Sequence, residues 1–233
     1  MNKQTFLTLL ATFALLFSFT FSCHAKGKDK AKHVVFIGLD GWGAYSLPKA
    51  DMPNVKKLME DGAYTLKKRS ALPSSSAINW ASMFMGAGPE LHGYTEWGSK
   101  TPELPSRVLN KNGIFPTVFQ LLRDARPEAE IGCLYEWEGI KYLVDTLSLS
   151  YHYHVADCNK TPKELGNMAS SYIKEKHPAL VAICYDGPDH TGHTAGHDTP
   201  EYYEKLKELD MYVGQIVQAV KDAGMLDDTI FIL

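Results

Sequence analysis

Short apolar runs that alternate with helix-like segments constrain the fold of this chain more than any other feature. Each run is bounded by turn residues and is typical of a strand buried on both faces. The runs occupy residues 33–39, 131–135, 179–185 and 229–233. This alternation predicts an α/β fold with a largely parallel sheet and helices on both faces.

Helix signals fill the stretches between these runs. Helices are expected over residues 55–61, from about 77 onward, and over 117–124, 161–176 and 199–223. Thr161-Pro162 predicts a capping threonine with proline in the first turn, and Thr199-Pro200-Glu201 is a strong start signal for the last helix. Residues 86–106 are rich in Gly, Pro and aromatic side chains, which favours a long ordered loop.

The first 25 residues have the anatomy of a secretory signal peptide. A short basic start precedes an apolar run from Phe6 to Phe21, and small residues lead to Ala25. Residues 26–32 then form a basic linker. An uncleaved anchor and lipid attachment at Cys23 are the alternatives. We therefore expect an exported chain that is periplasmic, extracellular or lipid-anchored at the cell surface.

Charge and cysteine content narrow the class of protein further. The chain has 24 Lys+Arg against 27 Asp+Glu, a formal net charge of −3, which argues against a nucleic-acid duplex as partner. Cys184 lies in an apolar run and is expected to be a buried strand thiol. Cys133 and Cys158 could form a disulfide in an oxidising compartment, but their spacing leaves this open.

Three polar groups fall where expected strands end. Asp40 follows the first strand, residues 74–79 lie at a loop-to-helix junction, and residues 186–193 follow a later strand. Because ligand sites in open parallel sheets gather at the carboxyl ends of strands, we expect these groups to converge. Together they offer carboxylates, imidazoles and a hydroxyl, which suit a metal-activated nucleophile.

Four motifs in order carry a resemblance to a known family. They are Gly38-Leu39-Asp40-Gly41, the Pro73-to-Asn79 segment, the loop from Gly86 to Gly93, and Asp189-His190-Thr191-Gly192-His193. The chain resembles the alkaline phosphatase superfamily, in particular its type I phosphodiesterase/nucleotide pyrophosphatase branch, from about Val34 to the end. The resemblance implies that residues 33–233 are the N-terminal part of an alkaline-phosphatase-like hydrolase domain.

The resemblance also implies a site with two divalent metal ions, expected to be Zn²⁺. Asp40 matches a ligand of the metal beside the nucleophile, and Ser76 matches the nucleophile, which also binds that metal. Asn79 matches an amide that hydrogen-bonds a phosphate oxygen, while Asp189 and His193 match ligands of the second metal. The implied reaction is in-line attack with a covalent phospho-Ser76 intermediate. Ser74 or Ser75 would take this role if the loop register differs.

The family supplies further metal ligands from a Ser/Thr-Asp-His-Gly segment and a later His. In this chain they would follow a strand such as 230–233 and so lie past Leu233. We therefore expect a fragment truncated at its C-terminus, with little or no hydrolase activity when expressed alone.

The interpretation is an exported, metal-dependent phosphoester hydrolase of the phosphodiesterase/nucleotide pyrophosphatase type. Its substrate is expected to be a small-molecule phosphoester, with nucleotides among the candidates, and any membrane contact is expected only through the signal peptide or a lipid at Cys23. A phosphomonoesterase of the same superfamily and a non-catalytic binding protein that retains the fold are the alternatives.

Several other side chains are given structural interpretations. Gly192 and Gly196 argue against a regular helix around His193, and His197 is assigned to a loop. The expected structural residues are His92 and Asp210, with core packing as the default for Trp80, Tyr94, Trp97 and Trp137.

Overall fold

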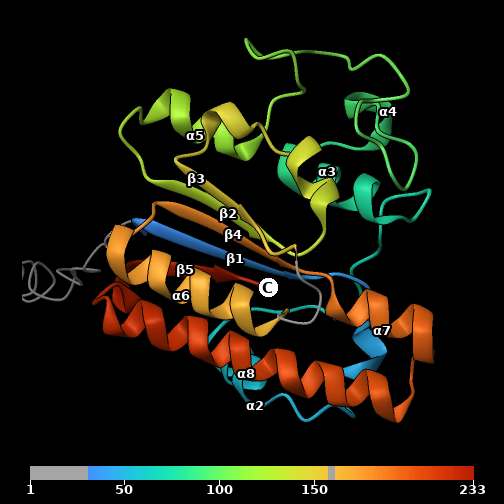
Figure 1. Cartoon of the computed structure of the whole chain (residues 1–233), viewed down its shortest axis with the longest axis vertical. Coiled ribbons are helices and arrows are strands. Elements are labelled where there is room, and N and C mark those ends of the chain that lie inside the picture. The colour runs from blue at the N-terminus through green and yellow to red at the C-terminus, as the bar shows by residue number, and fades with distance from the viewer. Residues whose placement is uncertain (1–30, 157–160) are drawn as a thin grey trace, which may run out of the picture. The chain divides into compact units, whose positions relative to one another are not determined.

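The computed structural model describes residues 31–156 and 161–233 (Figure 1). The predicted signal peptide, most of the linker, Cys23 and Cys158 lie outside these described residues. The strands are β1 (His33–Leu39), β2 (Ile131–Tyr135), β3 (Tyr151–His154), β4 (Leu180–Tyr185) and β5 (Thr229–Ile232). They form one sheet in the order β3-β2-β4-β1-β5, and every neighbouring pair is parallel. The expected fold class is confirmed.

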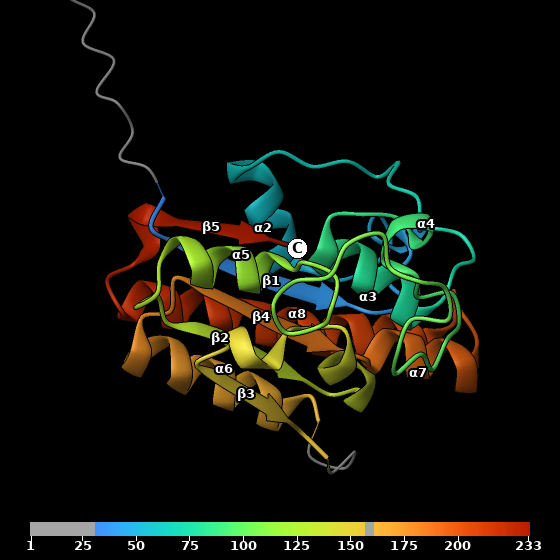
Figure 2. The same ribbon diagram turned by 90° about the horizontal axis from the view of Figure 1, so that it is seen from above.

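Helices cover both faces of this sheet (Figures 1 and 2). The α-helices are α2 (Pro53–Asp61), α3 (Ser76–Met85), α4 (Pro89–His92), α5 (Val118–Ala125), α6 (Lys163–Lys176), α7 (Gly187–Ala195) and α8 (Pro200–Asp222). Short 3₁₀ turns are η1 (Ala44–Ser46), η2 (Glu138–Tyr142), η3 (Thr146–Ser148) and η4 (Leu226–Asp228). Helices α2, α6 and α8 pack on one face, and α3 and α5 pack on the other. Within the described ranges, no helix is both long and apolar enough to span a bilayer.

Most predicted elements agree with the structure within a few residues, but four details differ. Helix α6 begins at Lys163 with Pro162 in the N-cap position, so the predicted threonine cap at Thr161 is wrong. The predicted start of α8 is confirmed, and the Thr199 side chain caps the helix by accepting a hydrogen bond from Tyr202 N. Strand β3 and helix α7 were not expected from the sequence, and the short helix α4 interrupts the loop predicted for residues 86–106.

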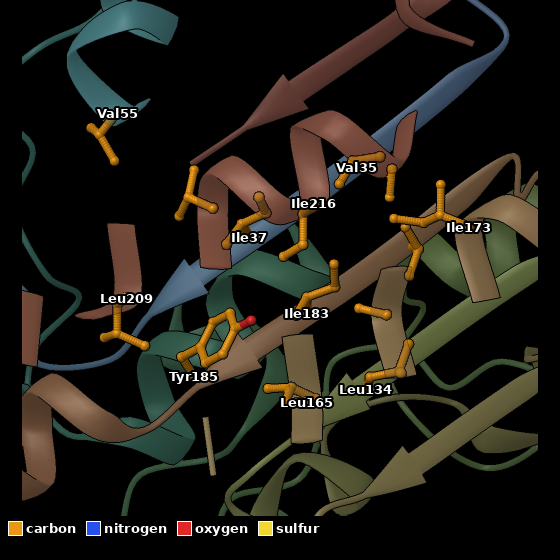
Figure 3. Close-up of a cluster of buried hydrophobic side chains, with 14 of the residues drawn as sticks. Val35, Ile37, Val55, Leu134, Leu165, Ile173, Ile183, Tyr185, Leu209 and Ile216 are labelled. Atoms are coloured by element: carbon orange, nitrogen blue, oxygen red, sulfur yellow. The ribbon is translucent and has the colours of Figure 1, made fainter. Parts of the chain in front are cut away.

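Two hydrophobic clusters, one on each face of the sheet, form the core. On the first face, Val35, Ile37 and Ile183 of the central strands contact apolar side chains of α6 and α8 (Figure 3). The second cluster includes Trp80, Phe84 and Phe119. Each fully buried aliphatic or phenylalanine side chain contributes roughly 1.5–3 kcal/mol through removal of apolar surface from water.

The sheet cysteines belong to this core. Cys133 on β2 and Cys184 on β4 are both buried free thiols. The prediction of a buried strand thiol at Cys184 is therefore confirmed. Pairing of Cys133 with Cys158 has no support here, because Cys133 is free and Cys158 lies outside the described residues.

The register of the central strands brings three carboxylates to one edge of the sheet. Gly38 of β1 and Tyr135 of β2 both pair with Cys184 of β4, so the three strands end side by side. Asp40 follows β1, Glu136 follows β2, and Asp186 follows β4. The N-termini of α3 and α7 lie beyond this same edge (Figure 2).

Candidate active site

Asp40 is held firmly at the end of β1. Its Oδ1 accepts a hydrogen bond from Gly41 N at 2.9 Å, and its Oδ2 accepts one from Trp80 Nε1 at 3.0 Å. Burial raises the pKa of Asp40, and the hydrogen bonds from Trp80 and the Ser76 hydroxyl oppose this rise. Asp40 and Ser76 are therefore neighbours, as the sequence predicted.

Ser76 is the first residue of α3, where backbone N–H groups and the helix dipole favour an anion. Ser75 occupies the N-cap position in an extended conformation, and its Oγ is buried without a hydrogen-bond partner in the described part of the chain. Of the three consecutive serines, Ser76 is the one that lines the neighbouring cavity.

Asn79 faces the loop that precedes α3. Its Oδ1 accepts a hydrogen bond from Ala71 N at 2.8 Å, and its Nδ2 donates to Ser75 O at 3.0 Å. These bonds fix the path of residues 71–75, which lead to Ser76. Asn79 does not line the cavity, so its contact with a phosphate oxygen stays a prediction.

Asp189 and His193 lie on helix α7, whereas the glycines around them predicted an irregular loop. The helix continues through Ala195 and ends at Gly196, whose φ is 93°. The i,i+4 spacing places both side chains on one face, with His193 Nε2 at 3.5 Å from Asp189 Oδ2. His193 is 78% exposed and Asp189 is 26% exposed, so both remain accessible to a ligand.

His197 lies outside this pair, in the loop after α7 as interpreted from the sequence. Its Nδ1 is 3.2 Å from Tyr45 Oη, and its ring packs 5.0 Å from that of Tyr202. The ring also approaches Gly192, where a Cβ would lie 2.4 Å from His197 Nε2. This close approach leaves no room for a side chain at position 192, which explains why a glycine stands inside α7.

A cavity of about 430 Å³ unites these elements. Its lining residues are Ser76, Trp97, Trp137, Asp186, Asp189, His190 and His193. Together with Asp40, which contacts Ser76, the cavity assembles four of the five residues predicted for the site. His190 and Asp186 had no firm role in the sequence interpretation.

Two tryptophans form an aromatic wall of this cavity. The Trp97 and Trp137 rings lie 6.1 Å apart with an interplanar angle of 32°, and Trp97 is 65% exposed. Default core packing is therefore right for Trp80 and Tyr94, which are buried, and wrong for Trp97. Trp137 is partly buried, packs against the second hydrophobic cluster and also lines the cavity. Sequence alone offered no signal that separates these aromatic residues.

The electrostatics of the cavity are dominated by carboxylates. Burial, together with the negative charges of Asp40 and Asp189, raises the pKa of Asp186 to about 6. Burial also raises the pKa of Glu136, to about 7. No Lys or Arg is among the described residues that line the cavity. This concentration of negative charge favours a cation.

The donor atoms match zinc in kind but not in number. Carboxylate oxygens and an imidazole nitrogen are ordinary Zn²⁺ ligands. Asp189 and His193 form one pair of donors, and Asp40 with Ser76 forms another. Within residues 31–156 and 161–233, however, no group of three or more His, Cys, Asp or Glu side chains is arranged to hold a metal ion. The described residues thus fit two cations chemically while providing an incomplete ligand set for each.

Comparison with known families agrees with this arrangement. Residues 34–233 match the family described as type I phosphodiesterase/nucleotide pyrophosphatase. The chain belongs to this family, which is a family of phosphoric ester hydrolases.

Individual relatives are distant. Ectonucleotide pyrophosphatase/phosphodiesterase family member 1 of Mus musculus is 23% identical over 201 residues, which cover 82% of this chain and 22% of the relative. Venom phosphodiesterase 2 of Crotalus adamanteus is 20% identical over 233 aligned residues, which cover 82% of this chain and 25% of the relative. GPI ethanolamine phosphate transferase 3 of Schizosaccharomyces pombe is 29% identical over 86 residues, covering 36% and 9%, respectively.

Solved structures support the fold. Murine ectonucleotide pyrophosphatase/phosphodiesterase 5, in an inactive form in complex with AMP, superposes with a TM-score of 0.64 and 17% identity. The superposition covers 86% of this chain and 55% of that structure. The chain therefore spans about half the length of this structure and about a quarter or less of the curated relatives.

Proposed function

We propose that this chain carries the nucleophile half of the active site of an exported, metal-dependent phosphodiesterase or nucleotide pyrophosphatase. The observation that carries the proposal is the meeting of Asp40 and Ser76 with Asp189 and His193 around one cavity. Family membership supports the reaction class. Because the chain covers only part of its relatives, the activity is proposed for the complete gene product.

Ser76 is proposed as the nucleophile that attacks phosphorus. Its hydroxyl hydrogen-bonds the Asp40 carboxylate, which can accept the hydroxyl proton as the new P–O bond forms. The N-terminus of α3 directs backbone N–H groups toward the developing negative charge on the phosphoryl oxygens. Departure of the leaving-group alcohol or phosphate then leaves a phosphorylated Ser76.

Two divalent cations, with Zn²⁺ as the proposed metal, would be held by Asp40 with Ser76 and by Asp189 with His193. When bound, such ions lower the pKa of a hydroxyl and neutralise phosphate charge. With only two donors for each ion among the described residues, we expect the 233-residue chain by itself to bind metal weakly and to hydrolyse esters poorly.

The aromatic wall supports a flat, stackable group on the substrate. Trp97 and Trp137 stand beside Ser76 in the cavity lining, and their rings can contact a nucleobase or another aromatic leaving group. The AMP held by the murine structure is consistent with a nucleotide substrate here. A small phosphoester is thus the proposed partner.

Export is part of the same proposal. Residues 1–25 have the sequence pattern of a signal peptide, residues 26–32 that of a linker, and Cys23 that of a loose lipid-attachment site. The names of the relatives, which include ectonucleotide and venom enzymes, agree with a location outside the cytoplasm. The mature hydrolase portion would then begin at residue 33.

The proposal is tested by assaying the complete gene product against three p-nitrophenyl substrates. These are p-nitrophenyl phosphate, its phenylphosphonate diester analogue and p-nitrophenyl sulfate. We expect the diester analogue to be hydrolysed fastest, and Ser76→Ala to reduce the rate by several orders of magnitude because the covalent route is lost.

Ser74→Ala is the matched control, because Ser74 belongs to the same serine run but does not line the cavity. It should retain most of the activity. Faster hydrolysis of the monoester would indicate a phosphomonoesterase. Absence of metal-dependent hydrolysis, or full activity of Ser76→Ala, would contradict the proposal and would favour a binding protein or another nucleophile.

A further inference from the structure

Helix α7 carries both proposed ligands of one cation, yet it lacks a local cap. Asp186 occupies its N-cap position and makes no side-chain capping hydrogen bond. Pro188, in the first turn, has no N–H to satisfy. The free N–H groups at this end of the helix therefore need an acceptor from elsewhere in the fold.

That acceptor comes from the neighbouring strand. Glu136 follows β2, and its Oε2 accepts a hydrogen bond from Asp186 N at 2.7 Å. The backbone N–H of Gly187 also stabilises the charged form of this carboxylate. Glu136 lies 50 residues from Asp186 in sequence, so it caps the helix across the sheet and not from within its own segment.

The backbone of Glu136 is itself fixed from two sides. Its N–H donates to Cys184 O at 3.1 Å, which extends the β2–β4 ladder by one residue. Its carbonyl oxygen lies 2.9 Å from His154 Nε2 at the end of β3. The carboxylate thus projects from a rigid part of the sheet, which is a suitable reference for positioning a helix.

The buried carboxylate of Glu136 does not by itself stabilise the fold. Within the described part of the chain, Oε1 of Glu136 is buried without a hydrogen-bond partner. A half-satisfied buried carboxylate destabilises a fold compared with an apolar side chain of similar size. A role in placing α7 explains why the carboxylate stands here.

We propose that Glu136 is a positioning residue for the active site, which sets α7 so that Asp189 and His193 face Asp40 and Ser76. This inference rests on the proposed function. Glu136 does not line the cavity and is not placed among the cation ligands. It acts on them through the helix, as residues behind metal ligands commonly do.

The test measures the Zn²⁺ affinity of the complete gene product by competition with a chromophoric chelator. Glu136→Ala should weaken binding by roughly tenfold or more, the usual effect of losing a partner behind the ligands. Glu136→Gln keeps an acceptor oxygen and should restore most of the affinity. Glu138→Ala is the matched control, because Glu138 lies two residues from Glu136 but is exposed and pairs with Lys141. It should leave the affinity unchanged.

Amide hydrogen exchange of the metal-free chain provides the second readout. Glu136→Ala should increase exchange in α7 by roughly fivefold or more through loss of its cap, while α6 and α8 stay protected. Unchanged exchange in α7 would overturn the positioning role. Absence of zinc binding in the unaltered complete gene product, together with faster α7 exchange in Glu136→Ala, would instead reject the metal site and retain the positioning role. Equal zinc affinity in the unaltered chain and Glu136→Ala would also overturn the inference.

Discussion

Gly41 packs directly against the backbone of Asp189: a Cβ on Gly41 would lie 2.5 Å from Asp189 Cα. This contact joins the end of β1, which carries Asp40, to the first turn of α7. Gly41 also has a φ of 67°, a backbone conformation that favours glycine. Two of the three parts of the site therefore meet at a position where a side chain does not fit.

Gly41→Ala should consequently destabilise the chain and weaken Zn²⁺ binding. Gly224→Ala is the control, because Gly224 has a similar φ of 70° and open space at the Cβ position. Gly224→Ala should lower the free energy of unfolding by about 1–2 kcal/mol, because a left-handed backbone is unfavourable for alanine. Gly41→Ala should lower the free energy of unfolding, measured with urea, by more than this, because α7 must also move. Equal losses in both variants would show that the approach of β1 and α7 is not tight.

The Trp80 indole stabilises the ionised form of Asp40 through its N–H. Trp80→Phe should lower the free energy of unfolding by about 1.5–3 kcal/mol at pH 8, the usual effect of a hydrogen bond to a charged group. Burial raises the pKa of Asp40, so the loss should become smaller as the pH falls through that raised pKa and the carboxyl takes up a proton. Trp42→Phe removes a 3.0 Å bond to the neutral Ser46 Oγ and should show no such pH dependence.

Asp210 confirms its predicted structural role by anchoring α2 to α8. It is buried and accepts hydrogen bonds from the backbone N–H groups of Asn54 and Val55 and from Asn54 Nδ2. Asp210→Ala should lower the free energy of unfolding by about 3 kcal/mol, because the buried N–H donors lose a charged acceptor. Asp222→Ala at the end of the same helix should change stability by less than about 0.5 kcal/mol. Urea unfolding monitored by circular dichroism compares the two.

The environment of His92 should make the stability of the fold depend on pH. Its Nδ1 accepts a bond from Tyr94 N, so Nε2 carries the proton and donates to Ser82 Oγ. Burial lowers the pKa of His92 below its ordinary value. The unfolded chain therefore binds a proton first as pH falls. The contribution of His92 is fully present above about pH 6.5 and is lost as pH drops toward the lowered folded pKa.

Replacement by a side chain that does not titrate in this range isolates the effect. The unfolding free energy of the unaltered chain should fall more steeply between pH 7 and 5 than that of His92→Gln. Parallel pH profiles for the two proteins would show that His92 titrates alike in the folded and unfolded chains.

The sheet could be predicted from sequence because its central strands are continuous apolar runs, such as Ile131–Tyr135, bounded by polar residues. Strand β3 escaped prediction because Tyr151–His154 alternates Tyr with His and therefore contains no continuous apolar run, although Tyr151 and Tyr153 pack against the first hydrophobic cluster. Its pairing with β2 is decided by tertiary contacts. Helix α7 escaped prediction because Gly192 and Gly196 argue against a helix locally. Its cap comes from Glu136, which follows strand β2 and is distant in sequence.

In the candidate site, too, some features could be predicted from sequence and others depend on tertiary contacts. The sequence predicted from motifs and from positions after strands that Asp40, Ser76, Asp189 and His193 lie close together, and the structure brings them together, while their catalytic and metal-binding roles stay predictions. Asn79 was assigned a phosphate contact, but its amide is bonded to Ala71 and Ser75. The roles of Glu136 and of the Trp97–Trp137 wall depend on contacts between distant segments, which local sequence patterns do not contain.

The most direct test of the account is to trap the covalent intermediate. The complete gene product is incubated with the phenylphosphonate diester analogue, quenched in acid, digested and analysed by peptide mass spectrometry. The account predicts a phosphorus-containing adduct on the peptide that includes Ser76, assigned to that residue by fragmentation and absent from Ser76→Ala. Turnover with the adduct on another residue, or with no adduct under conditions that trap such intermediates, would contradict it.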